Sequence, residues 1–153
     1  QVGAIQVAGL VAVNACGNVV DHESHEMLAG IYDKKTQQVI STKDVLLKQM
    51  DQIRKLPDGN TTIGCIVTNV KLNKAQCTKL AGICHDGYAR SIEPVHTMSD
   101  GDTIFVLSTN EVEGMVDAVG VLASEVTSMC IKRAILKAES AYGLKAYSDL
   151  KNR

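Results

Sequence analysis

The chain lacks tryptophan, and with one phenylalanine and four tyrosines it has few aromatic side chains on which unpaired bases could stack. It also lacks an excess of charge of one sign, because sixteen Lys and Arg residues stand against seventeen Asp and Glu residues, for a formal net charge of −1. Nucleic-acid binding requires a basic surface that neutralises phosphates. The composition therefore argues against a nucleic-acid partner.

The cysteines form no recognisable disulfide or metal framework. Their number is odd and no pair has C-x-x-C spacing, so neither a fully paired disulfide set nor a zinc ribbon fits. His22, His25 and Glu26 include an H-x-x-H spacing, but they fall short of a zinc ligand set and indicate a solvated loop. We expect a cytoplasmic protein without metal or other cofactor. The cysteines are Cys16, Cys65, Cys77, Cys84 and Cys130.

No segment has the composition of a membrane span. Residues 1–20 are uncharged and match the ~20 residues that a span requires, but Gln6, Asn14, Asn18 and several glycines interrupt them. They also lack the basic start and cleavage site of a secretory signal, so we expect no membrane association. The 153 residues suit a single domain. Because the chain opens at a glutamine, we expect it to be the C-terminal part of a longer precursor.

The hydrophobic pattern predicts a sheet covered by helices. We expect one or two core strands within 2–20, a short strand or hairpin arm at 27–32, a buried β-branched strand at 61–70 and a strand at 103–108. The Pro-Asp-Gly-Asn sequence within 55–60 marks a turn-rich connection. Strands alternating with helical segments indicate an α+β or layered α/β fold.

Four helices are predicted between these strands. Ser41 can cap a helix that continues to residue 53, and Asn73 can begin one whose apolar face includes Cys77, Leu80, Ala81, Cys84 and Tyr88. Asn110 can cap a long helix with an apolar stripe from Val112 to Met129. Residues 138–153 are expected to form a final, partly frayed helix.

The bond between Asn60 and Thr61 has the chemistry of a self-cleaving site. Attack of the Thr61 hydroxyl on the Asn60 carbonyl would shift the acyl group from nitrogen to oxygen, and water would hydrolyse the ester. Thr61 would then be an N-terminal residue with a free α-amine, which titrates near neutral pH and can act as a general base. One residue would supply both nucleophile and base.

Structural interpretations of the same residues remain open at this point. Thr61 can be an ordinary β-branched strand residue, and because strand neighbours point to opposite faces, only one of Thr61 and Thr62 can face a pocket. Asp100 and Asp102 can share a face in an extended chain, or belong to a solvated Asp-Gly turn. Cys84 invites a thiol mechanism beside a histidine, but its place on the apolar helix face favours a core cysteine.

Specific motifs occur in a fixed order along about two-thirds of the chain. They are Val2-Gly3-Ala4 through Val13-Asn14-Ala15, Gly17-Asn18-Val19, Gly59-Asn60-Thr61-Thr62-Ile63-Gly64, Val67-Thr68-Asn69, Leu80-Ala81 to His85-Asp86-Gly87-Tyr88-Ala89-Arg90, Pro94-Val95-His96-Thr97, and Asp100-Gly101-Asp102-Thr103-Ile104-Phe105. Together they resemble the DmpA family of self-processing aminopeptidases and amidases. That family includes L-aminopeptidase/D-esterase, β-peptidyl aminopeptidases and the nylon-oligomer hydrolase.

The resemblance implies an αββα sandwich of the N-terminal-nucleophile type, as in DmpA and ornithine acetyltransferase-like proteins. It implies that Thr61 is the nucleophile, that Asn60 precedes the cut, and that the Asn14 amide contributes to the oxyanion hole. Asp100 and Asp102 match the acidic or hydroxyl pair beside the nucleophile. Cleavage would leave 1–60 at the end of an α-subunit and 61–153 as a β-subunit.

The implied function is hydrolysis of small amides or short peptides through an acyl-enzyme. The partners expected are the amide or peptide substrate, the other subunit of the same precursor, and further copies in a homo-oligomer. An acyltransferase of the same fold is an alternative, as is a non-catalytic binding or assembly protein that never cleaves itself. His96 matches a family position near the pocket and is assigned no role.

Overall fold

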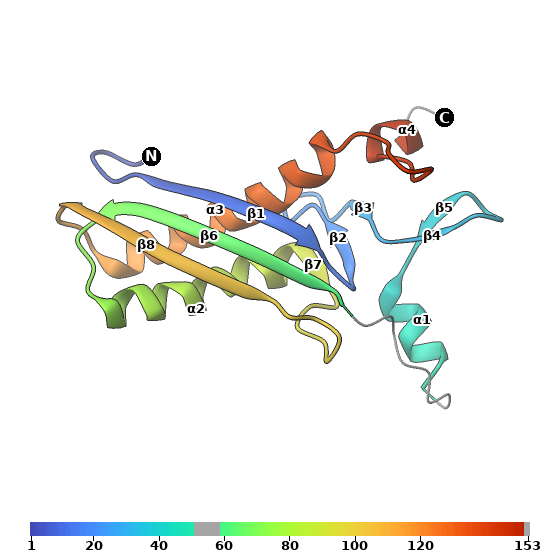
Figure 1. Cartoon of the computed structure of the whole chain (residues 1–153), viewed down its shortest axis with the longest axis horizontal. Coiled ribbons are helices and arrows are strands. Elements are labelled where there is room, and N and C mark those ends of the chain that lie inside the picture. Colours follow the sequence, from blue (N-terminus) through green and yellow to red (C-terminus); the bar gives the residue numbers. More distant parts are fainter. Residues whose placement is uncertain (51–58, 152–153) are drawn as a thin grey trace.

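Three long strands form the main sheet. The computed structural model describes residues 1–50 and 59–151, and its main sheet has the order β1-β6-β8, from β1 (Val7–Asn14), β6 (Thr61–Val70) and β8 (Thr103–Val112). The central strand β6 is antiparallel to β1 and parallel to β8 (Figure 1). The β-branched run at 61–70 therefore forms the predicted strand, whereas residues 51–53 of the predicted helix and 55–58 of the predicted turn lie outside the described residues.

Two long helices cover one face of this sheet. They are α2 (Lys74–Ser91), which connects β6 to the later part of the chain, and α3 (Val116–Lys137) (Figure 1). The predicted cap of α2 is confirmed, because Asn73 and Gln76 form a reciprocal capping box. Its predicted apolar face is confirmed too, since Leu80, Cys84 and Tyr88 are all fully buried.

Close packing of α2 depends on two glycines. A Cβ on Gly87 would lie 2.6 Å from the Ser124 carbonyl oxygen of α3, so only glycine permits this approach of the two helices. A Cβ on Gly64 of β6 would lie 2.8 Å from the Tyr88 hydroxyl. That hydroxyl donates to the Thr62 and Thr103 carbonyl oxygens, both at 3.3 Å. Tyr88 thereby fixes the first residues of β6 and β8 to the helix layer.

The smaller elements gather beside one end of the main sheet. A second sheet has the order β3-β2-β7, with β2 (Asn18–Val20), β3 (Met27–Ala29) and β7 (Ile92–Glu93). The predicted arm at 27–32 divides between β3 and the hairpin of β4 (Ile31–Asp33) and β5 (Gln38–Ile40). Helix α1 (Thr42–Lys48) has the predicted Ser41 cap, and a last short helix is α4 (Tyr147–Lys151).

Two helix predictions are wrong. Asn110 does not cap a helix but lies within β8, where its Oδ1 accepts a hydrogen bond from the Leu72 amide at 2.9 Å. A side chain that satisfies a neighbouring backbone amide in this way is unavailable for capping. Helix α3 therefore begins later, after Met115, and the predicted stripe fails at both ends, because Val112 is in a strand and Met129 is half exposed.

The predicted C-terminal helix over 138–153 is reduced to α4. Residues 138–146 are not helical, and a bridge pairs Ala141 with Leu144. Tyr142 and Gly143 between them have positive φ angles of 54° and 79°, which an α-helix does not allow. In the described part of the chain, no helix combines the length and apolar character that crossing a bilayer requires.

Among residues 1–50 and 59–151, no layer covers the other face of the main sheet. Strand alternation turns Leu10, Ile63, Phe105 and Leu107 to this face, and they are 77%, 49%, 59% and 52% exposed. The register aligns Leu10, Cys65 and Phe105 in one row across the three strands. We call this surface the bare face. The α+β class is confirmed, with a helix layer on one side and an apolar sheet surface on the other.

Candidate active site

The predicted site residues meet at one end of the main sheet. Thr61 opens β6, and Asn14 ends β1 directly opposite it in the register. Because β8 runs parallel to β6, its start also lies at this end, and Asn60 pairs with Asp100 in a parallel bridge. Asp102 follows immediately before β8. Residues separated by nearly ninety positions are thus brought together by strand order alone.

The Asn60–Thr61 peptide bond has both a hydroxyl and an amide donor against its carbonyl oxygen. Thr61 Oγ1 donates to the Asn60 oxygen at 2.5 Å, and the Gly101 N–H donates to the same oxygen at 2.9 Å. A Cβ on Gly101 would lie 2.9 Å from Thr61 Oγ1, so a side chain there would displace the hydroxyl. Gly101 was not among the predicted site residues, although it separates the two aspartates in the Asp-Gly-Asp motif.

Asn14 places a side-chain amide beside the same segment. Its Nδ2 donates to the Gly59 carbonyl oxygen at 3.0 Å, one residue before Asn60. Asn14 and Thr61 occupy facing positions on β1 and β6, and their side chains belong to the row that turns toward the bare face. Thr62 points the other way and is fully buried, so the prediction that the two threonines face opposite sides is confirmed.

The two aspartates accept hydrogen bonds from backbone amides of three segments that meet at this end of the sheet. Asp100 Oδ1 accepts from the Cys16 amide at 3.1 Å, and its Oδ2 accepts from the Thr97 amide and hydroxyl at 3.0 and 2.7 Å. Asp102 Oδ1 accepts from the Thr62 amide at 2.9 Å, and its side chain is only 4% exposed. Asp102 thus fixes the loop before β8 against the strand that Thr61 opens, and Asp100 fixes it against the segment that follows β1.

Two histidines lie behind Asp102. His96 Nδ1 is 2.8 Å from Asp102 Oδ2, and His96 Nε2 is 3.2 Å from His85 Nδ1. The pKa of His85 is lowered by burial and, to a smaller extent, by His96. His85 comes from α2 and His96 from the loop after β7, so no local spacing in the sequence indicates that they meet.

The other candidate groups, two cysteines and a histidine, have surroundings typical of structural rather than catalytic residues. Burial raises the pKa of the Cys84 thiol to about 11, which confirms a core cysteine and disfavours a thiolate nucleophile. Burial also raises the pKa of Cys16, and the nearby Asp100 carboxylate adds to that rise. His22 lies 3.5 Å from Glu125. Within residues 1–50 and 59–151, no group of three or more His, Cys, Asp or Glu side chains is placed to hold a metal ion.

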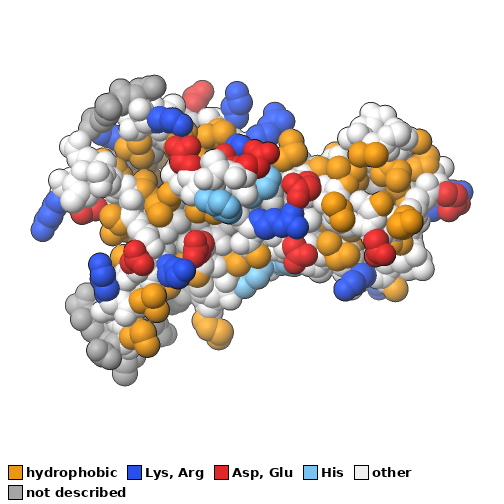
Figure 2. Space-filling view, turned by 180° about the vertical axis from the view of Figure 1, so that it is seen from behind, with side chains coloured by type: hydrophobic (Ala, Val, Ile, Leu, Met, Phe, Trp, Pro, Cys, Tyr) orange, Lys and Arg blue, Asp and Glu red, His pale blue; other side chains and the backbone are white. Residues whose placement is uncertain are grey.

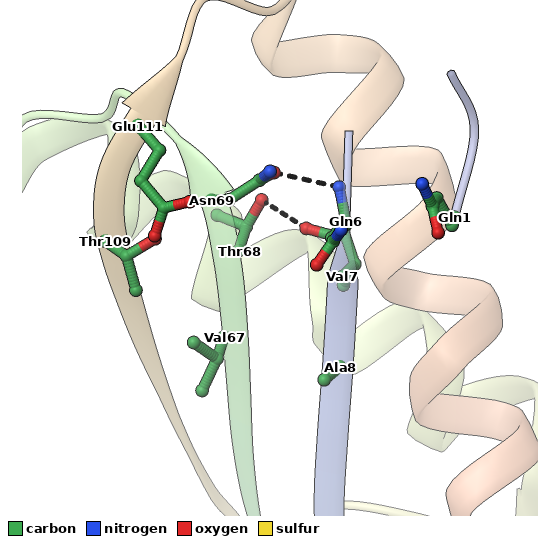
Figure 3. Close-up of a pocket in the computed structure, with 9 residues that line it drawn as sticks. All are labelled: Gln1, Gln6, Val7, Ala8, Val67, Thr68, Asn69, Thr109 and Glu111. Atoms are coloured by element: carbon green, nitrogen blue, oxygen red, sulfur yellow. Dashed lines mark hydrogen bonds between the residues drawn. The ribbon is translucent and has the colours of Figure 1, made fainter. Parts of the chain in front are cut away.

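A cavity of about 370 Å³ lies at the opposite end of the sheet (Figure 3). There Thr68 Oγ1 donates to the Gln6 carbonyl at 2.9 Å, and the Gln6 amide donates to Asn69 Oδ1 at 2.8 Å. These polar side chains satisfy backbone groups of the neighbouring strand. At about 3.3 Å per residue, Thr68 is ~23 Å along β6 from Thr61, so this cavity is remote from the candidate site.

The surface seen from behind the view of Figure 1 has a mixed charge pattern. Figure 2 shows basic and acidic side chains interspersed with hydrophobic ones on this face. Ion pairs within the chain join opposite charges, for example Arg90 with Glu125 and Lys132 with Asp21. The pairing agrees with the small formal net charge of the chain.

Comparison with known proteins places this mixed α+β chain among the peptidases. The sequence model of peptidase family S58 matches residues 1–148. Because the match spans nearly the whole chain, the chain belongs to peptidase family S58, and the resemblance to the DmpA family is confirmed.

The similar proteins include peptidases and an oligomer hydrolase. The chain is 32% identical over 161 residues to an uncharacterized aminopeptidase of Mycobacterium leprae, a match that covers 94% of this chain and 44% of the relative. It is 31% identical over 169 residues to an uncharacterized aminopeptidase of Mycobacterium bovis, covering 95% and 48%. With the 6-aminohexanoate-oligomer endohydrolase of Paenarthrobacter ureafaciens it shares 31% identity over 117 residues, covering 74% and 32%. The chain thus spans less than half the length of these relatives.

Proposed function

We propose that this chain carries the nucleophile of a self-processing amidohydrolase that cleaves small amides or short peptides. The observation that carries the proposal is the contact of one carbonyl oxygen, that of Asn60, with both Thr61 Oγ1 and the Gly101 amide. An attacking hydroxyl and a backbone donor for the developing oxyanion are the two groups that cleavage of this bond requires.

The processing step follows from these contacts. Thr61 Oγ1 attacks the Asn60 carbonyl carbon, and the Gly101 N–H stabilises the negative charge that forms on the carbonyl oxygen. The hydroxyl proton passes to the Thr61 nitrogen as the C–N bond breaks, which leaves an ester between Asn60 and the Thr61 oxygen. Water then hydrolyses the ester to an Asn60 carboxylate and restores the Thr61 hydroxyl beside a free α-amine.

The processed enzyme would use the same residues on an external amide. The Thr61 amine takes the proton from the Thr61 hydroxyl during attack, and later gives it to the leaving amine. Asn14 would donate its amide N–H to the oxyanion, while Asp100, bound to Cys16 and Thr97, and Asp102, bound to the Thr62 amide, would keep the backbone around Thr61 in place. The names aminopeptidase and 6-aminohexanoate-oligomer endohydrolase, given to the relatives, both describe amide-bond cleavage and support this substrate class.

The exposed apolar side chains of the bare face favour the idea that a second layer, formed by the rest of a longer precursor, covers it. Contiguous apolar surface of this kind marks an interaction site, and the chain spans 44% of the Mycobacterium leprae relative. A second sheet packed on Leu10, Ile63 and Phe105 would complete the αββα sandwich that the family resemblance implies. It would also supply pocket walls next to Thr61, whose side chain turns to the same face.

The decisive experiment is a mass measurement on the denatured, purified full-length protein, with N-terminal sequencing of each fragment. A fragment that starts at Thr61 is expected, Thr61→Ala should abolish it, and Thr61→Ser should retain it. Thr62→Val is the matched control, because the buried Thr62 hydroxyl has no hydrogen-bond partner among the described residues, and this variant should process like the parent.

The same preparation separates the alternatives. Release of acid from amino-acid amides and short peptides supports the hydrolase, whereas preferential transfer of the acyl group to an added amine supports the acyltransferase. Two results together would favour a non-catalytic binding protein: the chain stays uncut through long incubation, and Thr61→Ala behaves like the parent in every amide assay.

A further inference from the structure

A chain of three side chains runs from the candidate site to the surface of α2. Asp102 is bound through one carboxylate oxygen to the Thr62 amide and through the other to His96 Nδ1, at 2.9 and 2.8 Å. His96 Nε2 continues the chain to His85 Nδ1 at 3.2 Å. Among the hydrogen bonds of the described residues, only those of Asp102 connect the two histidines to the strand that begins at Thr61.

The order of donors and acceptors in this chain follows from chemistry. An ionised carboxylate only accepts hydrogen bonds, so His96 must carry its proton on Nδ1 to donate to Asp102. In neutral His96 the Nε2 atom is then an acceptor, and His85 must donate from Nδ1. His85 therefore selects the ring form of His96 that can bind the carboxylate.

Asp102 depends on this arrangement because it is nearly inaccessible to water. Its side chain is 4% exposed, whereas that of His96 is 39% exposed. A buried carboxylate oxygen without a donor is costly. Without His96, this oxygen of Asp102 would lose its donor, and rotation of the side chain toward water would disturb its bond to the Thr62 amide.

The backbone at His96 is held in an unusual conformation. Its φ of 55° is in the left-handed region, which few residues other than glycine adopt, His, Asn and Asp more often than the rest. Non-glycine residues retain such conformations where the surroundings require them, and these positions cluster at functional sites. Here the conformation aims the ring at Asp102, while the Tyr88 ring lies beside both histidines, with centroids 5.3 and 6.1 Å away.

We propose that His96 is a positioning residue for the Thr61 site: it holds the Asp102 carboxylate against the Thr62 amide, and His85 keeps His96 in the ring form that does so. The inference rests on the function proposed above. It assigns His96 no contact with substrate or with Thr61. Its effect reaches the nucleophile through Asp102 and the backbone of Thr62, the residue bonded to Thr61.

Two substitutions separate this role from simple support of the fold. His96→Asn keeps an N–H donor near the position of Nδ1, and His96→Gly removes the donor, while both residues tolerate the positive φ. In the full-length protein, His96→Gly should slow the appearance of the fragment that starts at Thr61 by about 10- to 100-fold, as loss of an orienting partner does elsewhere. His96→Asn should recover most of that rate.

The melting temperature of each variant is measured alongside, with Gly82→Ala as a control on α2, since a Cβ there meets no atom within 4 Å. A rate loss in His96→Gly that His96→Asn recovers, at comparable melting temperatures, supports the positioning role. Equal rates in the parent and His96→Gly would overturn it and leave self-processing intact. Equal losses in both variants would overturn it as well, because a retained donor would then have no effect. A parent that is never cut overturns both the inference and the proposed function.

A spectroscopic measurement keeps the inference testable if a variant fails to fold. In ¹⁵N-labelled protein at neutral pH, long-range proton–nitrogen correlation should find the His96 proton on Nδ1, the less common form of a neutral histidine. In His85→Leu the Nε2–H form should become populated. A parent with its His96 proton on Nε2 would refute the arrangement regardless of any activity.

Discussion

Replacement of Gly101 by alanine should greatly slow self-processing without unfolding the protein. The added Cβ would lie 2.9 Å from Thr61 Oγ1, about half an ångström inside ordinary van der Waals contact. The backbone of Gly101 is not in the left-handed region, so alanine itself fits, and the hydroxyl is the group that must move. The Gly101 N–H is retained, and the substitution therefore tests the position of the nucleophile alone.

The expected effect is a loss of about 10²-fold in the cleavage rate, the size found when a reacting group is misplaced by around 1 Å. The rate is measured by following the mass of the newly synthesised full-length protein over time, from uncut chain to the fragment that starts at Thr61. Gly82→Ala is again the control and should process normally. Processing of Gly101→Ala at the parental rate, with an unchanged melting temperature, would refute the assignment of Thr61 Oγ1 as the attacking atom.

Three further predictions concern stability, turnover and pH. Gly87→Ala should destabilise the protein by about 1–3 kcal/mol, because a backbone oxygen of α3 blocks the new Cβ. Gly82→Ala on the same helix should instead stabilise the protein by about 0.5–1 kcal/mol. Urea denaturation of both variants measures this difference, and equal effects on stability would contradict the packing argument. Asn14→Ala should lower kcat of the processed enzyme on an amide substrate by about 10²–10³-fold, as loss of an oxyanion donor does, and an unchanged kcat would exclude that role. Burial and His96 lower the pKa of His85, so the folded protein binds a proton at His85 less readily than the unfolded chain does. The contribution of His85 to folding stability is therefore complete above the ordinary histidine pKa of about 6.5, and it is lost as the pH falls through the pKa of His85 in the folded protein. The melting temperature should accordingly decrease on acidification below about pH 6.5, and less steeply in His85→Gln.

The predictable part of the fold is the part in which local pattern and tertiary packing agree. The run at 61–70 is β-branched and lies in the middle of the sheet, so its strand bounds match the prediction. Helix α2 has both a capping box and an apolar face. The failures have tertiary causes: Asn110 binds the amide of Leu72, 38 residues away, and α3 packs partly through buried Ser124, Thr127 and Ser128, which a search for apolar stripes passes over.

The candidate site divides in the same way. Asn60, Thr61, Asp100 and Asp102 lie in motifs that stand out in the sequence, and the sheet brings them together with Asn14. Gly101 contributes its backbone amide and the space left by its missing side chain, and the residue type alone predicts neither role. The histidines join the site through a loop and a helix whose relative position depends on the packing of Tyr88, so their connection to Asp102 could not be predicted from spacing.

The position of Thr61 in β6 links folding to function. Burial of the even-numbered residues of β6 against α2 and α3 necessarily turns Thr61 to the bare face, together with Ile63. The donors that our mechanism requires for self-cleavage, the Thr61 hydroxyl and the Gly101 amide, both come from within this chain. Under the proposed function, a covering layer would supply the walls of a substrate pocket on that face, because the described residues leave it an open sheet surface. Self-cleavage and substrate turnover therefore have separate structural requirements: substitutions on the bare face away from Thr61, such as Phe105→Ser, should reduce turnover more than they slow cleavage of the Asn60–Thr61 bond.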